Sequence, residues 1–144
     1  MDQGGEALKA KEYLQKIRDG ERLLRLFEAE HAQCEADIQN LKGMSYDKPI
    51  VTGGGQPVDL SSAIAKLEGY VERVNRQWDK VIKMREEAKA LIAKVPDARY
   101  RDILTRRYIL SERWEQIACA MGYTYRWVAH MHGAALRAFE KEFL

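Results

Sequence analysis

The stretch from Trp114 to Gly133, WEQIACAMGYTYRWVAHMHG, places Gly122 between two short amphipathic patterns. A glycine there predicts a tight turn, because glycine adopts positive φ without the steric clash of a Cβ atom. Ala118 is small where two helix backbones would cross. The apolar positions are Ile117, Met121, Val128 and Met131. This pattern predicts a helix-turn-helix, in which two short helices bury one face against each other.

Thr124 follows the turn and can cap the second helix by accepting a backbone N–H. The residues left on the outer face are Tyr125, Arg126, Ala129, His130 and Gly133. The N-terminal part of the second helix in such a motif enters the major groove, so duplex DNA is the predicted ligand. An ordinary helical hairpin with a glycine in its turn is the alternative.

Arg126 is the best candidate for reading a base, because a guanidinium can bind guanine O6 and N7 together. A phosphate contact or a solvated surface arginine is the alternative. His130 could contact DNA or simply be exposed. Tyr125 could stack on a sugar or hydrogen-bond to a phosphate, or it could be partly buried.

Two long heptad patterns precede the motif, and each predicts a helix with one apolar stripe. The first, over residues 6–42, contains Ala10, Tyr13, Ile17, Gly20, Leu24, Phe27, His31, Cys34, Ile38 and Leu41, and Leu14 and Leu23 widen it. The second starts near Asp59 or Ser61 and contains Ile64, Leu67, Val71, Val74, Trp78, Val81, Arg85, Ala88, Ile92 and Val95. Residues 43–58, with the sequence TGGGQP, predict a flexible connection.

Leaving such long apolar stripes in water would cost a large free energy, because each Å² of exposed apolar surface costs about 25 cal/mol. The two helices therefore pair as an antiparallel coiled-coil hairpin within one chain, or they assemble between chains. A two-helix pair is thin, which favours a homodimer or another oligomer through these N-terminal helices.

A third helix is predicted over residues 98–110, because Pro96 ends the second helix and Asp97 can cap the next. Its apolar face contains Tyr100, Ile103, Leu104 and Tyr108. Ser111 is expected to start the first helix of the motif, beneath which Trp114 can pack. The last helix continues through Leu136, Phe139 and Phe143 and folds back over the third helix.

The predicted fold is therefore all-α, with a long hairpin over residues 1–95 and a three-helix helix-turn-helix unit over residues 96–144. No apolar run approaches the roughly 20 residues of a membrane span, and the N-terminus lacks the apolar core of a signal peptide. We expect a cytoplasmic protein without a membrane partner. Cys34 and Cys119 are expected to be reduced thiols.

The formal net charge of the 144 residues is +2. Residues 1–95 contain 16 Lys and Arg against 16 Asp and Glu, and residues 96–144 contain 8 against 6. The positive excess thus lies with the motif but is small. Because DNA affinity depends largely on phosphate neutralisation, a single copy should bind weakly unless a second copy or a protein partner adds contacts.

The sequence contains no pattern that predicts a cofactor, a metal site or an enzyme. His31 and Cys34 have the spacing of a ligand pair, but a structural zinc site needs a second pair. His130 and His132 point to different helix faces. TGGGQP lacks the Gly-Lys-Ser/Thr ending of a phosphate-binding loop. No nucleophile or acid–base pair stands out, so we expect neither catalytic residues nor a cofactor.

The segment YRDILTRRYILSERWEQIACAMGYTYRWVAHMHGAALRAFEKEF resembles region 4 of sigma-70-type transcription factors. The shared features are Arg107 with Tyr108, Glu115 through Ala118, Met-Gly-Tyr-Thr at the turn, and Ala135 with Leu136. The whole chain looks like small phage and prophage proteins that are sigma-like or late-gene transcription regulators. The C-terminal match covers about a third of the chain.

The resemblance implies a DNA-binding transcription regulator in a bacterial host cell, with contact to RNA polymerase as a further expectation. The residues that would contact DNA are Thr124, Tyr125, Arg126, Trp127, His130 and Arg137. Trp127 and Ala129 replace polar or basic residues that are frequent in that family, so base contacts should be few. Nothing resembles the sigma region that melts a promoter, so a complete sigma factor is not expected.

Two other functions remain alternatives. A small terminase-like subunit for DNA packaging also joins a helix-turn-helix to helical oligomerisation segments, although such proteins usually carry the DNA-binding unit first. A protein-interaction module could instead grip polymerase without reading DNA, as the low net charge and the bulky Trp127 would allow.

Overall fold

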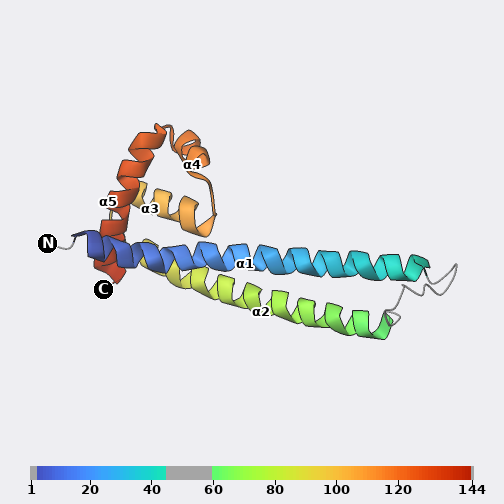
Figure 1. Cartoon of the computed structure of the whole chain (residues 1–144). Coiled ribbons are helices and arrows are strands. Elements are labelled where there is room, and N and C mark those ends of the chain that lie inside the picture. The colour runs from blue at the N-terminus through green and yellow to red at the C-terminus, as the bar shows by residue number, and fades with distance from the viewer. Residues whose placement is uncertain (1–2, 45–59, 144) are drawn as a thin grey trace. The chain divides into compact units, whose positions relative to one another are not determined.

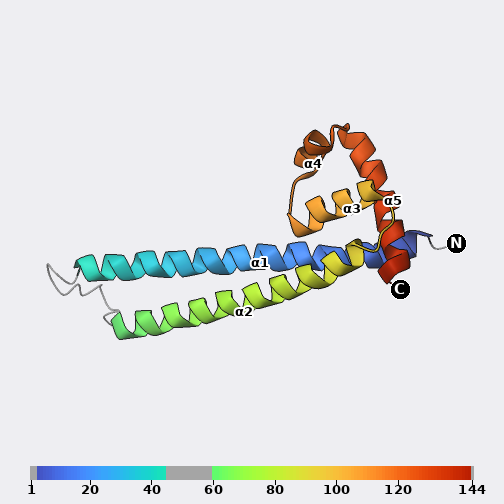
Figure 2. The ribbon, with the colours of Figure 1, turned by 180° about the vertical axis from the view of Figure 1, so that it is seen from behind.

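The computed structural model describes residues 3–44 and 60–143, and over these residues the chain is helical and contains no strand. The elements in order are α1 (Gln3–Met44), α2 (Leu60–Ile92), α3 (Ala98–Leu104), the π-helical segment η1 (Thr105–Ile109), α4 (Trp114–Met121) and α5 (Tyr125–Phe143) (Figure 1). Helices α1 and α2 pack together as a hairpin, as both views show (Figure 1 and Figure 2). The predicted all-α fold with a long hairpin is confirmed.

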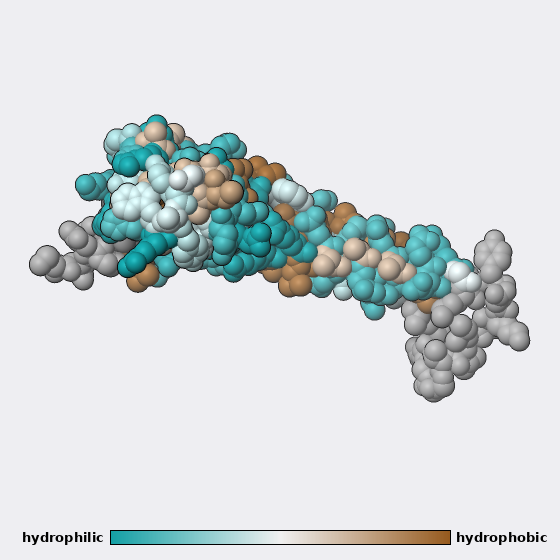
Figure 3. All heavy atoms as spheres, turned by 90° about the horizontal axis from the view of Figure 1, so that it is seen from above, coloured by the Kyte–Doolittle hydropathy of each residue, from teal (hydrophilic) through white to brown (hydrophobic). Residues whose placement is uncertain are grey.

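No helix in the described ranges is both long enough and apolar enough to cross a membrane. Most of the surface in the space-filling view is hydrophilic, with separate hydrophobic patches between the polar residues (Figure 3). Gly43 and Met44, at the start of the predicted connection, belong to α1. The rest of that connection, with TGGGQP, lies outside the described residues.

The chain divides into two compact units that differ from the predicted domains. One unit contains Met1–Glu21 with Lys80–Leu144, and the other contains Arg22–Asp79. The division does not fall at residue 95, because the end of the hairpin shares a core with the C-terminal helices. That core contains Ala10, Leu14, Ile17, Ala88, Ile92, Val95, Leu104, Tyr108, Ala135, Leu136 and Phe139.

Helix α5 packs against α3, which confirms that the last helix folds back over the third predicted helix. Phe139 of α5 is completely buried, and its ring stacks with those of Tyr13 and Phe143 at centroid distances of 6.0 and 5.9 Å. Tyr108 is buried in the same core. These aromatic contacts hold the C-terminal half of α5 on the start of α1.

The predicted helix over residues 98–110 is not α-helical throughout, and Ser111 does not start the next helix. The backbone widens into η1, where the N–H of Leu110 donates to the carbonyl of Thr105 at 2.9 Å. Ser111 then adopts a left-handed φ of 56°, which a helix cannot include. Its hydroxyl donates to the carboxylate of Glu21, a residue of α1. Helix α4 therefore begins only at Trp114.

Within the unit Arg22–Asp79, the apolar stripe of α1 faces α2 as predicted, but the stripe of α2 is rotated. Leu24 and Ile38 of α1 are buried. On α2, Gln77 is buried and Ala63, Leu67, Tyr70 and Val74 are half-buried, whereas Ile64, Val71 and Trp78 are exposed. Leu23 was expected to widen the stripe of α1, but it is exposed. A two-helix pair buries only a narrow strip of each helix, so one side of the predicted apolar stripe of α2 remains exposed to solvent.

Cys34 and His31 lie half-buried in this unit, and each lies near another group of the chain. The Cys34 Sγ lies 3.9 Å from the carbonyl oxygen of Ala63, and His31 Nε2 lies 3.5 Å from a carboxylate oxygen of Glu35. Cys34 and Cys119 are both free cysteines. Across the described residues, no three His, Cys, Asp or Glu side chains gather in a group that could hold a metal ion.

Replacing Phe139 by alanine should lower the free energy of unfolding by about 3–5 kcal/mol, because it removes a buried ring and leaves a cavity. Chemical denaturation followed by circular dichroism measures this change. Leu110→Ala is the control, since Leu110 is exposed and its truncation should change stability by less than about 0.5 kcal/mol. Equal losses in the two variants would contradict the assigned core.

Candidate nucleic-acid interface

The turn between α4 and α5 is built on a left-handed glycine, as the sequence predicts. Gly122 has φ 71° and ψ 30°. The N–H of Tyr123 donates to the carbonyl of Ala118 at 3.0 Å, which satisfies a carbonyl at the end of α4. An added Cβ at Gly122 would meet no atom within 4 Å, so the need for glycine comes from the backbone conformation rather than from crowding.

The two helices cross over a small apolar core that includes α3. Its buried residues are Ile103, Ile117, Ala118, Val128 and Met131, and Tyr100, Trp114 and Met121 pack against them. All four predicted apolar positions, the small Ala118 and the packing of Trp114 are confirmed. Residues 114–143 therefore do not form one continuous rod, and α3, α4 and α5 share one core.

Thr124 caps α5 as predicted. Its Oγ1 accepts a hydrogen bond from the backbone N–H of Trp127 at 3.1 Å. This contact satisfies one of the N–H groups that the first turn of a helix leaves without an intrahelical partner. The cap fixes where α5 begins, and therefore which side chains its first turns present.

The six predicted contact residues are all exposed: Thr124, Tyr125, Arg126, Trp127, His130 and Arg137. Tyr125 is 54% exposed and Trp127 is 44% exposed. Tyr125 also lines a pocket, so it is accessible to a ligand and partly packed at the same time. The rings of Trp127 and His130 stack with centroids 5.2 Å apart. The face therefore combines one stacked aromatic pair with two arginines.

Five of the six residues lie close together, in the cap and the first two turns of α5. Arg126, His130 and Arg137 recur at intervals of four and seven residues, which places them on one line along the helix. Arg137 lies about 10 Å beyond His130 along the axis, at about 1.5 Å per residue. From Tyr125 to Phe139 the helix contains no acidic residue, so no carboxylate of α5 itself opposes an approaching phosphate on this face.

The four arginines of residues 98–110 are engaged within the protein. Arg99 pairs with Asp97 at 3.1 Å, and Arg106 pairs with Asp102 at 2.7 Å. Arg101 donates to the carbonyl of Val95 at 2.6 Å. Arg107 also donates to a backbone carbonyl, that of Glu112, at 3.1 Å. The positive excess of the C-terminal residues is thus used largely for internal contacts.

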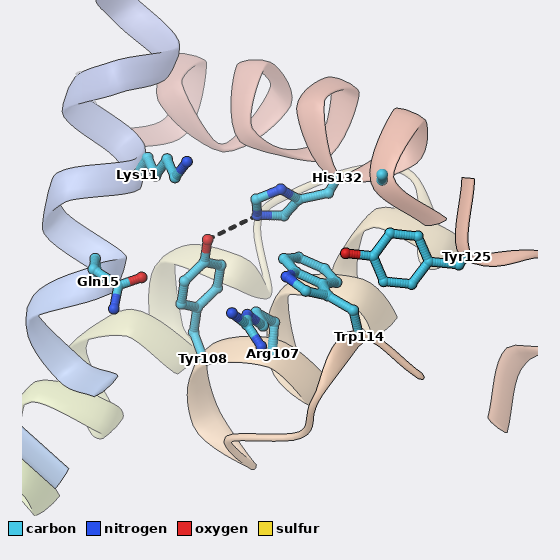
Figure 4. Close-up of a pocket in the computed structure, with 8 residues that line it drawn as sticks. Lys11, Gln15, Arg107, Tyr108, Trp114, Tyr125 and His132 are labelled. Atoms are coloured by element: carbon cyan, nitrogen blue, oxygen red, sulfur yellow. Dashed lines mark hydrogen bonds between the residues drawn. The ribbon is translucent and has the colours of Figure 1, made fainter. Parts of the chain in front are cut away.

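A pocket of about 360 Å³ lies beside the first turns of α5 (Figure 4). Its lining residues are Lys11, Gln15, Arg107, Tyr108, Trp114, Tyr125, Ala129 and His132. Lys11 and Gln15 come from α1, and Trp114 opens α4. The pocket therefore joins α1, η1 and both helices of the motif at one place.

His132 is the centre of the contacts inside this pocket. Its Nε2 lies 2.7 Å from the hydroxyl oxygen of Tyr108, and its ring meets the edge of Trp114 with centroids 4.5 Å apart. The guanidinium of Arg107 lies over Trp114, 4.2 Å from the ring centroid. These contacts tie α5 to η1 and to the first residue of α4, and they hold the exposed face in place.

Burial and the nearby positive charges of Lys11 and Arg107 lower the pKa of His132 from 6.5 to about 4. The imidazole is therefore neutral at pH 7, and Nε2 can accept the hydroxyl proton of Tyr108. Burial also raises the pKa of Tyr108 to about 12, so this hydroxyl keeps its proton.

The sequence predicted that His130 and His132 point to different faces, which is confirmed, but it did not identify the role of His132. Its partner Tyr108 lies 24 residues away. The available signal was the position of His132 four residues after Val128, on the buried side of α5. Comparisons of the chain with protein-family models, curated proteins and solved structures gave no match.

The stability of the protein should fall between pH 6.5 and pH 4 in part because of His132. Its folded-state pKa is depressed, so the unfolded chain takes up the proton first as the pH falls, and unfolding is favoured. The neutral His132 imidazole contributes fully to the free energy of unfolding above pH 6.5, and this contribution should be lost below pH 4. The expected change is about 3 kcal/mol, at 1.36 kcal/mol per pKa unit.

Denaturation curves at a series of pH values measure this loss. His132→Gln should flatten the pH dependence in this window, whereas His130→Gln, at an exposed histidine, should leave it as in the wild type. A His132→Gln protein with the wild-type slope would contradict the buried neutral imidazole.

Proposed function

We propose that the chain is a DNA-binding, phage-type transcription regulator that reads a promoter or operator through α4 and α5. The observation that carries the proposal is that all six predicted contact residues, at the N-cap and along α5, are exposed, whereas Val128 and Met131 of the same helix are buried in the α4–α5 crossing. The positive-φ turn and the Thr124 cap leave the first turns of α5 free to enter a major groove.

In this proposal, α5 makes both base and phosphate contacts. Arg126 would bind guanine through its guanidinium, a contact worth about 1–3 kcal/mol of discrimination. The exposed surface of Trp127 suits apolar contact with a thymine methyl group. Thr124 and Tyr125 lie at the N-terminus of α5, where backbone N–H groups and the helix dipole favour a phosphate. Arg137 would reach the backbone further along the groove.

The regulator would act by positioning other proteins and would make or break no bond. Bound beside a promoter, it would bring RNA polymerase to its site, as the resemblance to sigma region 4 suggests. Because the DNA-reading face carries only two arginines, contact with polymerase or with a second copy would add the affinity that one copy lacks.

A protein-interaction module is the second candidate, and the exposed aromatic residues favour it. Tyr123, Tyr125 and Trp127 are all exposed around the start of α5. Aromatic side chains are enriched in protein–protein interfaces, whereas strongly cationic surfaces are typical of DNA interfaces. With this second function, α5 would bind RNA polymerase directly. A DNA-packaging subunit has no comparable observation in its favour.

The double substitution Arg126→Ala with His130→Ala should weaken specific DNA binding by about tenfold or more, because each lost base contact contributes at least about 1 kcal/mol. The DNA is obtained by sequencing the fragments that the wild-type protein retains from a pool of genomic DNA, and affinity is measured by fluorescence anisotropy. Arg76→Ala is the matched control, since Arg76 is an exposed arginine of α2 and belongs to the compact unit that does not contain α5.

Unchanged affinity in the double variant, with helicity intact, would show that α5 does not read DNA. The dependence of affinity on salt separates the two candidates, because phosphate contacts release counterions. Binding that weakens as salt rises supports the regulator. No DNA affinity together with capture of purified RNA polymerase would select the protein-interaction module.

A further inference from the structure

Helix α2 carries a row of large apolar side chains that the hairpin does not cover. Ile64, Val71 and Trp78 are 40%, 39% and 38% exposed. They recur every seven residues, which places them on one line along the helix. Leu67 and Val74 lie between them and are half-buried, so they contribute to the margin of the same row. All five residues belong to the compact unit Arg22–Asp79.

One end of this row borders a groove between α1 and α2. The groove has a volume of about 480 Å³. Ile64 and Leu67 line it from α2, and the small side chains of Ala32 and Ala36 line it from α1. Polar and charged residues of α1, including Glu35 and Lys42, also line the groove. The lining thus mixes apolar and polar side chains, and Ile64, Leu67 and the two alanines supply the part that can contact a large apolar side chain.

The row and the groove are complementary to each other under a two-fold axis. Trp78 lies seven residues after Val71, and Ile64 lies seven residues before it. If two α2 helices pair antiparallel with Val71 on the axis, the Trp78 side chain of each copy meets Ile64 of the other. Each indole then reaches the other copy's groove. One surface thus supplies both the projecting side chain and the cavity, as an isologous dimer requires.

The polar residues beside the row fit the same arrangement. The flanking positions 61, 68 and 75 hold Ser, Glu and Asn, so Glu68 is the single charge among them. In the antiparallel pairing, Glu68 comes opposite Asn75 of the second copy, whose amide can donate to the carboxylate. No like charges meet along this margin.

We propose that a second copy of this chain docks on the row, with the α2 helices antiparallel and Trp78 of each copy in the groove of the other. The dimer would bury three exposed apolar residues of each copy and place a tryptophan anchor in a pocket, the usual form of an interface hot spot. It would also bring two helix-turn-helix units into one assembly. The inference rests on residues 22–79 and does not require that α5 bind DNA.

Sedimentation velocity of the full chain over a concentration series tests the association. The wild type should be a dimer that dissociates on dilution. Trp78→Ala should raise the dimer dissociation constant about 30-fold, as loss of a hot spot does, and Val71→Glu should abolish the dimer by placing two carboxylates on the axis. Leu26→Glu is the matched control, because Leu26 is 56% exposed and lies on the other flank of α1 from Ala32 and Ala36. It should leave the dimer intact.

Disulfide formation tests the geometry, in a background with Cys34→Ala and Cys119→Ala. Val71→Cys should cross-link under mild oxidation, because residue 71 meets its own copy on the axis. Ile64→Cys should not, because two copies of residue 64 would lie about 21 Å apart along the helices at about 1.5 Å per residue. A parallel pairing would cross-link both variants and would overturn the arrangement. A wild type that remains monomeric at every concentration, or equal loss of the dimer in Leu26→Glu, would overturn the interface.

Discussion

The crossing of α4 and α5 is the constraint on which the rest of the structure depends. Gly122 allows the chain to turn within one residue at positive φ, and Ile117 and Val128 then become buried against each other and against Ile103 of α3. With the inner face of α5 buried in this way, the outer face has to meet solvent or a ligand. An L-residue with a Cβ at position 122 would strain the turn and loosen this arrangement.

A second set of contacts fixes this crossing to the π-helical segment η1. His132 joins Tyr108 and Trp114, and Arg107 covers Trp114, so the side of α5 behind the exposed face has defined partners. The same packing uses the arginines of residues 98–110 for internal contacts and leaves the exposed face with a modest positive charge. The weak positive charge of the exposed face of α5 and the uncovered apolar row on α2 both favour the proposed assembly of copies, which would add phosphate contacts and would cover the row.

The sequence predicted the features that local rules determine. A glycine at a turn, a threonine at a helix start and apolar spacing across two short helices each have one dominant structural solution, so Gly122, Thr124 and the crossing were predicted correctly. The π-helical segment and the left-handed Ser111 were not, because Ser111 is held by Glu21, 90 residues away in the sequence. Over residues 60–79 the apolar stripe of α2 was predicted in the wrong rotation, since two adjacent stripes, one through Ile64 and one through Ala63, share Leu67 and Val74 and both have helical spacing. The later part of the stripe is buried as predicted, at Val81, Ala88, Ile92 and Val95. His132 was missed because its partner Tyr108 comes from another helix.

We propose that the first turns of α5 form the surface that binds duplex DNA. A backbone amide NMR titration of the full chain with a duplex selected from genomic DNA tests this proposal. The largest chemical-shift changes should fall on residues 124–137, with little change over residues 22–79. Changes centred on the hairpin, or no saturable change at residues 124–137, would contradict it.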